Sequence, residues 1–301
     1  MFDITIIGSG VAGMTAALYA LRSNKRVLIL EKENYGGQIA KSPKVENYPT
    51  LKTISGSELA DKIFDQIVDL GVVFELEEVE HIDKSGETFT IKTNYNTYES
   101  KAVVIANGVK PRMLHLDNEE KYLGHGVYYC AICDGPFFAG KDVVLVGDGN
   151  SAMQYALMLA DYCTKVTMVT MFDKFFGEKS LEDAIRSNPK IEIIPNAVAS
   201  ALHGEDYLTQ VEFTSTDKSK FTIDTNALFV AIGQVADNEK FSNVVDLDKA
   251  GYIVADESCM TRTQGVFVAG DCRVKNIRQV ATAIGDGAVA GTGAVNYINT
   301  L

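Results

Sequence analysis

The sequence predicts an α/β protein with two Rossmann-like three-layer dinucleotide-binding domains, the second inserted in the first. Two glycine-rich turns indicate these domains, since each follows an apolar strand and precedes a helical segment and another strand. An apolar strand and a helix at residues 263–297 come after the second domain and are needed to complete the first sheet. We therefore expect residues 1–111 and 242–301 to form one domain and residues 112–241 to form the other.

The first glycine-rich turn lies within the first 31 residues. The apolar run FDITIIG leads into GSGVAG, in which Gly8, Gly10 and Gly13 have the G-x-G-x-x-G spacing. The first glycine allows the turn, the second lets a pyrophosphate approach the backbone, and the third lets helix and strand pack closely. Glu31 ends the next strand, where an acid accepts a hydrogen bond from a ribose hydroxyl. The alternative is a glycine-rich turn without a ligand, which the acid in register disfavours.

A second turn of this kind, GDGNSA, contains Gly147, Gly149 and Ala152 between the strands KDVVLVG and KVTMVT. Two such domains are typical of a flavoprotein that binds, or once bound, a pyridine nucleotide. Late in the chain, TQGVFVAGDC places Asp271 at a strand end, where cofactors bind in open α/β sheets. The small residues of the following helix indicate close packing against a bulky group, either a flavin or another helix.

Composition and charge exclude several other classes of protein. A net charge of −12 provides no basic surface to neutralise phosphates, so a nucleic-acid partner is not expected. The N-terminus enters a strand directly and has no signal-peptide pattern. No run approaches the ~18 apolar residues of a membrane span. We expect a cytoplasmic protein.

Cys130 and Cys133 lie in the segment YYCAICDGP and can form a zinc site, a structural disulfide or a redox-active pair. A zinc site needs further ligands, but the other three cysteines are isolated and the four histidines are scattered, so no metal is expected. A redox-active pair needs two sulfurs close together and a thiolate of lowered pKa. A protonated Asp134 can serve as general acid for the thiolate that leaves a substrate disulfide. This pattern favours the redox-active pair.

The whole chain resembles the low-molecular-weight thioredoxin reductases, which are FAD flavoproteins. The matching stretches are GSGVAG, GGQI with VENYP, CAICDG, GDGNSA and AGDCRVKNIRQVATAIGDGA, in the order and spacing of the family. The resemblance implies that the first and last segments bind FAD, that Cys133 is the sulfur nearest the flavin, that Cys130 attacks thioredoxin, and that Asp134 is the acid. It also implies a homodimer. The implied FAD site contains Gly8, Gly10, Gly13, Glu31, Gly37, Gln38, Asn47, Asp271, Arg278, Gln279 and Ala281.

The sequence departs from this family where NADPH is usually bound. The family carries His-Arg-Arg-x-x-x-Arg after the second strand of the inserted domain, and its arginines hold the 2′-phosphate. Here Thr170, Met171, Phe172 and Phe176 stand at these positions. Losing several charge-assisted hydrogen bonds, at roughly 1.5–3 kcal/mol each, weakens NADPH binding by orders of magnitude. Thr170 is also a poor acceptor for the ribose of NADH.

Two further changes affect the same domain. Asp148 puts a carboxylate between the two glycines, near the pyrophosphate, and Gln154 and Tyr155 replace an acidic pair near the nicotinamide. We therefore expect reduced ferredoxin, a one-electron carrier, to reduce the flavin. Ferredoxins are usually acidic, so docking on this acidic chain needs a local basic patch. The candidate patches are Lys41, Lys44 and Lys52, or Lys275 and Arg278.

Two alternatives to a ferredoxin-dependent enzyme stay open. One is a thioredoxin reductase that uses NADPH or NADH through an atypical nucleotide site. The other is a non-catalytic flavin protein that acts as a redox sensor.

Overall fold

The computed structural model describes residues 1–42, 45 and 47–301, and the backbone alone of Cys133. The chain divides into two compact units. Unit 1 contains Met1–Lys110 and Val235–Leu301, and unit 2 contains Pro111–Gln234. The expected boundary after residue 241 was wrong, because residues 235–241 belong to unit 1. Phe241 explains the difference, since its fully buried ring packs in a hydrophobic cluster of unit 1.

Unit 1 is built on one seven-stranded sheet with the order β3-β2-β1-β6-β5-β4, and β17 also pairs with β6. The pairs β1–β2, β2–β3, β1–β6 and β17–β6 are parallel, whereas β4–β5 and β5–β6 are antiparallel. The parallel strands are nearly continuous apolar runs because both of their faces are covered. The strands are β1 (Phe2–Ile7), β2 (Val27–Glu31), β3 (Val73–Leu76), β4 (Val79–Ser85), β5 (Thr88–Thr93), β6 (Thr97–Ile105) and β17 (Val266–Val268).

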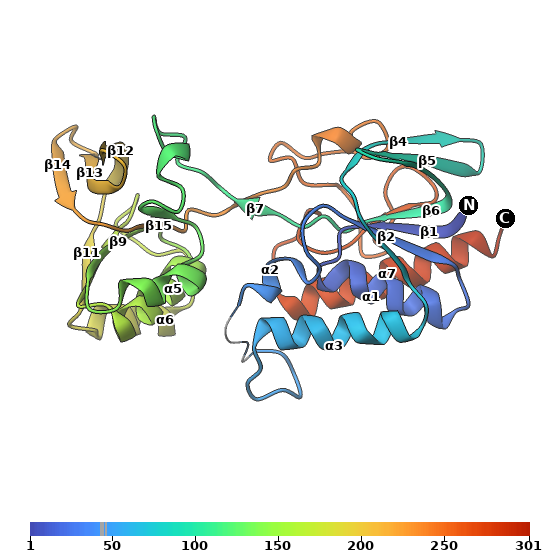
Figure 1. Cartoon of the computed structure of the whole chain (residues 1–301), viewed down its shortest axis with the longest axis horizontal. Coiled ribbons are helices and arrows are strands. Elements are labelled where there is room, and N and C mark those ends of the chain that lie inside the picture. The colour runs from blue at the N-terminus through green and yellow to red at the C-terminus, as the bar shows by residue number, and fades with distance from the viewer. Residues whose placement is uncertain (43–44, 46) are drawn as a thin grey trace. The chain divides into compact units, whose positions relative to one another are not determined.

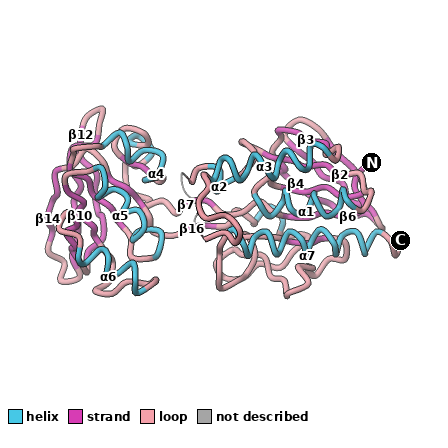
Figure 2. Tube along the Cα trace, turned by 90° about the horizontal axis from the view of Figure 1, so that it is seen from below, coloured by secondary structure: helices cyan, strands magenta, loops and turns pink. Residues whose placement is uncertain are grey.

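Three helices cover one face of this sheet and run side by side (Figures 1 and 2). They are α1 (Val11–Arg22), α3 (Gly56–Asp69) and α7 (Val280–Ile298), and the short α2 (Gly37–Ala40) follows β2. The small residues of α7 allow it to approach α1. A Cβ atom on Gly287 would lie 2.3 Å from the Ala12 carbonyl oxygen, and one on Gly291 would lie 2.6 Å from that of Ala16. The bulky neighbour expected for this helix is therefore another helix.

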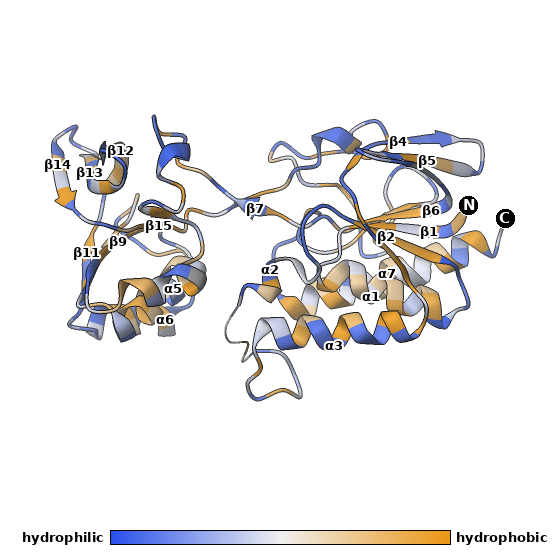
Figure 3. Ribbon diagram, in the orientation of Figure 1, coloured by the Kyte–Doolittle hydropathy of each residue, from blue (hydrophilic) through white to orange (hydrophobic). Residues whose placement is uncertain are grey.

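The opposite face of the sheet is covered by chain that follows the return from unit 2. The 3₁₀ helix η3 (Glu239–Phe241) begins this segment, and Phe241, Val244, Val245 and Ile253 pack against β1, β2 and β6. Figure 3 shows the hydropathy pattern that goes with this burial: the central strands of unit 1 are apolar, whereas polar and apolar residues alternate along α3. Unit 1 thus has three layers, and the carboxyl ends of its parallel strands lie between them.

Unit 2 repeats this plan with a five-stranded parallel sheet of order β11-β10-β9-β15-β8. Its strands are β8 (Val127–Tyr128), β9 (Asp142–Val146), β10 (Lys165–Val169), β11 (Ile191–Ile194) and β15 (Leu228–Val230). A three-stranded antiparallel sheet joins β12 (Ala197–Gly204), β13 (Leu208–Ser215) and β14 (Lys220–Asp224). Its helices are η1 (Glu120–Tyr122), α4 (Ala131–Asp134), η2 (Gly135–Phe138), α5 (Asn150–Tyr162) and α6 (Lys179–Ser187).

The chain crosses between the units twice, at the short strands β7 (Lys110–Pro111) and β16 (Gln234–Val235). These two strands pair with each other, and the Arg112 amide donates to the Gly233 carbonyl at 2.9 Å. The two crossings thus form one two-stranded ribbon. Among the described residues, no helix has the length and apolar character required to span a bilayer.

Candidate functional site

The first glycine-rich turn connects β1 to α1, and each of its three glycines has a different environment. Gly8 has a φ of +99°, and a Cβ atom there would lie 2.4 Å from the Ala106 carbonyl oxygen. A Cβ atom on Gly13 would lie 2.0 Å from the Gly8 carbonyl oxygen. By contrast, a Cβ atom on Gly10 would meet nothing within 4 Å. Gly8 and Gly13 are therefore required by the fold itself, whereas Gly10 leaves space open at the N-terminus of α1.

Glu31 lies at the end of β2, beside this turn. Its Oε2 accepts hydrogen bonds from the amide and the hydroxyl of Ser9, both at 2.8 Å. Its Oε1 accepts from the amides of Lys32 and Glu33, at 2.9 and 3.0 Å. These four donors fix the carboxylate at the strand end, next to the position of a ligand on the turn.

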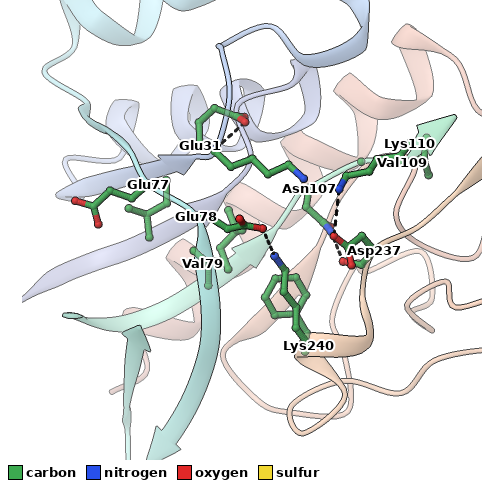
Figure 4. A pocket seen from close by; sticks show the side chains of 15 residues that line it. Glu31, Glu77, Glu78, Val79, Asn107, Val109, Lys110, Asp237 and Lys240 are labelled. Carbon is green, nitrogen blue, oxygen red and sulfur yellow. Dashed lines mark hydrogen bonds and ion pairs between the residues drawn. The ribbon is translucent and has the colours of Figure 1, made fainter. Parts of the chain in front are cut away.

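A pocket opens beside Glu31, as Figure 4 shows. The ends of β2 and β6, the start of β4 and the segment 237–241 form its walls. Sequence reasoning identified Glu31 alone among the pocket residues that carry polar side chains. It missed Lys32, Glu77, Glu78, Asn107, Lys110, Asp237 and Lys240. The only sequence signal was that Asn107 and Gly108 closely follow an apolar strand, as Gly270 and Asp271 do.

Residues of the GGQI and VENYP stretches lie near this turn and near the start of α7. A Cβ atom on Gly37 would lie 3.1 Å from the Gly10 Cα atom. The Gln38 side-chain amide donates to the Val109 carbonyl at 2.6 Å, and that of Asn47 donates to the Gln279 side chain at 2.9 Å. Segments far apart in the sequence therefore meet around the carboxyl ends of the strands.

Asp271 follows β17 and has a carboxyl group that is mostly buried. Its Oδ1 has no hydrogen-bond partner among the described residues. Burial raises the pKa of Asp271 above its usual range. A buried polar atom without a partner is costly in a folded protein, so this oxygen fits a ligand that brings a hydrogen-bond donor.

Arg278, Gln279 and Ala281 lie at the start of α7. The Arg278 guanidinium donates to the Asp271 carbonyl at 3.3 Å and lies 4.2 Å from the centre of the Tyr252 ring. Gln279 caps α7 through reciprocal hydrogen bonds with Thr282, and Ala281 is exposed in the first turn. These residues shape the helix end beside Asp271.

A buried ion cluster close to Asp271 was missed by sequence reasoning. The Asp286 carboxylate accepts two hydrogen bonds from Arg273, at 2.9 and 2.8 Å, one from Lys275 at 2.7 Å and one from the Gly270 amide at 3.0 Å. Burial alone would raise the pKa of Asp286, but these hydrogen bonds lower it. The Lys275 side chain is only 8% exposed. Lys275 therefore anchors the loop that follows Asp271 and cannot serve in a basic docking patch.

In unit 2, Cys130 directly precedes the one-turn helix α4. Cys130 is disulfide-bonded, and its carbonyl oxygen accepts from the Asp134 amide at 3.0 Å. The side chain of Cys133 lies outside the described part of the structure. Upstream, the Tyr129 hydroxyl donates to the buried Glu119, which also accepts from the amides of Leu114 and His115. This network fixes the segment that leads into Cys130.

Asp134 is half-buried, and no described residue forms an ion pair with it. Burial raises the pKa of its carboxyl group above the usual range for aspartate. The protonated form is therefore more populated than in an exposed aspartate, as a general acid requires. Within the described residues, no group of three or more His, Cys, Asp or Glu side chains is arranged to hold a metal ion.

Asp134→Asn is expected to slow thioredoxin reduction by about 100-fold, because the amide has no proton to donate. Since the pKa in the folded state is raised, the stability that Asp134 contributes is greatest at low pH and falls as the pH rises through that pKa. The substitution should remove this loss and so increase stability at neutral pH. Single-turnover assays and thermal unfolding, both followed across pH, measure the two effects. The exposed Asp206→Asn is the control, and equal pH profiles for the two variants would contradict the assignment.

The second glycine-rich turn has the backbone geometry of the first. In unit 1, the Gly36 amide donates to the Ser9 carbonyl at 2.9 Å, and in unit 2 the Phe176 amide donates to the Asp148 carbonyl at 2.8 Å. Bridges between Gly10 and Gly36 and between Gly149 and Phe176 accompany these bonds. The scaffold of a dinucleotide site is therefore intact in both units.

The side chains around the two turns differ. Where Glu31 holds Ser9 in unit 1, unit 2 has the buried Thr170, whose hydroxyl donates to the Phe172 carbonyl at 2.7 Å. The acid lies instead on the turn itself, as the half-buried Asp148, and burial raises its pKa. No described residue forms an ion pair with this carboxylate. A diphosphate on this turn would therefore lie next to an uncompensated negative charge.

Two aromatic rings lie where arginines hold the 2′-phosphate in the family. The rings of Phe172 and Phe176 pack edge to face with their centres 5.4 Å apart, and the Lys174 ammonium lies 5.1 Å from the Phe176 ring centre. Both rings are about half exposed, at 43% and 51%. Tyr155 packs against the core of unit 2, and Gln154 is exposed. Residues 170–178 include no arginine, and Arg186, whose guanidinium lies 5.3 Å from the centre of the Phe175 ring, is ion-paired with Glu182.

Comparisons with known proteins agree with this geometry. The family described as pyridine nucleotide-disulphide oxidoreductase matches residues 2–287. The chain is 39% identical over 298 residues to the "34.2 kDa protein in rubredoxin operon" of Clostridium pasteurianum, covering 98% of this chain and 97% of that protein. It is 36% identical over 303 residues to a thioredoxin reductase of Listeria innocua, covering 100% and 95%.

Solved structures give the same result. The thioredoxin reductase of Lactococcus lactis in its FR conformation superposes with a TM-score of 0.96 at 34% identity, covering 100% of both chains. A ferredoxin-flavin thioredoxin reductase of Clostridium acetobutylicum has a TM-score of 0.55 at 30% identity, covering 100% and 99%. These matches confirm the α/β fold with two dinucleotide-binding domains and a FAD-dependent flavoprotein. The chain therefore belongs to the pyridine nucleotide-disulphide oxidoreductase family and, within it, to the low-molecular-weight thioredoxin reductases.

Proposed function

We propose that this thioredoxin reductase receives its electrons from reduced ferredoxin and passes them through FAD and the Cys130–Cys133 pair to thioredoxin. The observation that carries the choice of donor is the second glycine-rich turn. Its scaffold is intact, yet Asp148, Phe172 and Phe176 replace the groups that would bind phosphate. A donor that needs no nucleotide site avoids this obstacle.

The residues of unit 1 fit FAD. Gly10 leaves open space at the N-terminus of α1 for a pyrophosphate, and Glu31 is fixed beside it for a ribose hydroxyl. Asp271 has a buried oxygen that receives no hydrogen bond from any described residue. We assign Gly8, Gly13, Gly37, Gln38, Asn47, Arg278, Gln279 and Ala281 to the same site. When bound, FAD accepts electrons one at a time or in pairs, which suits a one-electron carrier.

The dithiol chemistry belongs to unit 2. Thioredoxin reduction consumes two electrons and two protons, so two ferredoxins must deliver one electron each per disulfide. The Cys130 thiolate attacks one thioredoxin sulfur, forming a mixed disulfide while the other thioredoxin sulfur leaves as a thiolate. Asp134 supplies a proton to that leaving thiolate. Cys133 then attacks the mixed disulfide, which releases reduced thioredoxin and restores the Cys130–Cys133 disulfide.

A second candidate donor is a pyridine nucleotide. It is favoured by the family description and by the backbone hydrogen bonds that the two turns share. A cytoplasmic homodimer remains a prediction for either donor. Five basic residues were considered for ferredoxin docking. Lys41 and Lys52 are exposed, Arg278 is partly buried, the Lys275 side chain is only 8% exposed, and Lys44 lies outside the described residues.

An anaerobic titration of the purified flavoprotein separates the two donors. We expect reduced ferredoxin to bleach the flavin absorption band and to support thioredoxin reduction, whereas NADPH and NADH leave the band unchanged. A variant with Asp148→Gly, Met171→Arg, Phe172→Arg and Phe176→Arg is the matched control, since it supplies the missing phosphate contacts and should gain reduction by NADPH. Rapid bleaching of the unmodified protein by NADPH or NADH would overturn the proposal.

A further inference from the structure

The side chain of Asn238 joins separate parts of unit 1 by hydrogen bonds, and the proposed mechanism gives this residue no role. Its side chain is 1% exposed and lies just after the second crossing from unit 2. Its Oδ1 accepts from the Asn107 side-chain amide at 3.1 Å. Its Nδ2 donates to the carbonyls of Cys272 and Gly251, each at 2.9 Å. One buried amide thus joins the returning chain to the loops that follow β6 and β17.

Those two loops carry the residues that face the proposed cofactor. Asn107 and Val109, in the loop after β6, line the pocket beside Glu31, and the Val109 carbonyl accepts from Gln38. Asp271 directly precedes Cys272 in the loop after β17. The Oδ1 atoms of Asn107 and Asp271 are buried, and each lacks a hydrogen-bond partner among the described residues. Each loop therefore offers a hydrogen-bond acceptor to a ligand, and each is also hydrogen-bonded to the side chain of Asn238.

The returning chain also forms part of the pocket wall. Asp237 accepts from the Asn107 amide through its carbonyl at 3.0 Å, and its carboxylate lies 3.5 Å from the Lys110 ammonium. Lys240 contacts Glu78 on the other side of the pocket, at 3.2 Å (Figure 4). The outgoing crossing, at Lys110, and the returning crossing, at Val235, are therefore both tied to the walls of one pocket.

We infer that Asn238 is a positioning residue that couples FAD binding to the order of the segment 234–241, by which the dithiol unit is connected to unit 1. The inference rests on the proposed placement of FAD on the Gly8 turn and Asp271. Because linkage is reciprocal, a cofactor that holds the two loops also holds the returning chain, and a loosened returning chain weakens the cofactor. Asn238 does not line the pocket itself, so its effect on FAD must pass through the loops.

The test compares wild type with Asn238→Ala and, should that variant fold poorly, with the smaller change Asn238→Ser. Amide hydrogen exchange of residues 234–241 is measured with and without FAD, and FAD release is followed by flavin fluorescence. In wild type, FAD should slow exchange in 234–241 but not in α3. In the variants this FAD-dependent slowing should be lost, and FAD affinity should fall about tenfold.

Asn243→Ala is the matched control. Asn243 lies nearby and donates to the Ile82 carbonyl at 2.7 Å, and none of its hydrogen bonds to described residues reaches either cofactor loop. It should keep both the FAD affinity and the FAD-dependent slowing. The inference is overturned if Asn238→Ala speeds exchange in 234–241 equally with and without FAD while FAD affinity is retained, which is the behaviour of a purely structural residue. The identity of the electron donor does not enter this experiment, so its failure is distinct from a failure of the donor assignment.

Discussion

Cys130→Ser is expected to abolish thioredoxin reduction while leaving the flavin bound and reducible. The substitution removes the sulfur that attacks thioredoxin, and a serine hydroxyl is not ionised near neutral pH and cannot form the mixed disulfide. Cys130 lies in unit 2, whereas the proposed FAD residues lie in unit 1. We expect turnover to fall by at least about 1000-fold, in line with the loss of an essential nucleophile. Steady-state thioredoxin reduction and the flavin absorption spectrum together measure the outcome.

Cys163→Ser provides the control for this prediction. Cys163 is a free, buried cysteine of the same unit, and its thiol lies 3.4 Å from the Phe138 carbonyl oxygen. Serine can keep that contact, so this variant should retain turnover. If Cys130→Ser retained it as well, the chain would be no dithiol reductase, and the flavin redox sensor considered above would be the better description.

Gly10→Ala is expected to give a folded protein that loses FAD. The Gly10 backbone has an ordinary φ of −67°, and an added Cβ atom would meet no protein atom within 4 Å. The open space around Gly10 is where the pyrophosphate would approach the backbone, so a methyl group there displaces it. We expect FAD affinity to fall by about 100-fold or more, which corresponds to about 2.7 kcal/mol. Flavin content after purification and equilibrium titration measure the loss, and circular dichroism confirms folding.

The matched substitution is Gly285→Ala, in α7. A Cβ atom at Gly285 also meets nothing within 4 Å, and alanine is the better helix former. This variant should keep its flavin and gain slightly in stability. If the purified Gly10→Ala protein retained its full content of FAD, the assignment of the first glycine-rich turn to the cofactor site would be wrong.

Sequence reasoning predicted the parts of the fold that depend on local chemistry. The two glycine-rich turns were recognisable because Gly8 and Gly13 in the first, and Gly147 in the second, lie too close to a carbonyl oxygen for any side chain. The parallel strands were recognisable because burial on both faces makes them continuous apolar runs. Asp271 was found because it closely follows such a strand, β17. In each case one short segment carried the physical requirement.

What the sequence did not reveal depends on contacts between distant segments. The pocket beside Glu31 is closed by Asn107 and Asp237, which are 130 residues apart in the chain and joined by a hydrogen bond. Lys275 appeared to be a surface charge. Its side chain is buried because its ammonium forms an ion pair with Asp286, which lies in the following helix α7. The return to unit 1 was placed too late because, of the polar residues at 237–240, only Asn238 is buried, and nothing in the local sequence marks it as buried. No local pattern records such pairings.

The paired crossings have a consequence for how this enzyme can be rebuilt. Since the amide of Arg112 bonds the carbonyl of Gly233, the two ends of the dithiol module are neighbours, and a short peptide can replace everything between them. Excision of unit 2 should leave a smaller protein that still binds FAD. Insertion of a different module at the same junction should pass the electrons to a different acceptor. The electron acceptor of such a flavoprotein can therefore be changed by replacing unit 2 alone, without altering the FAD-binding residues of unit 1.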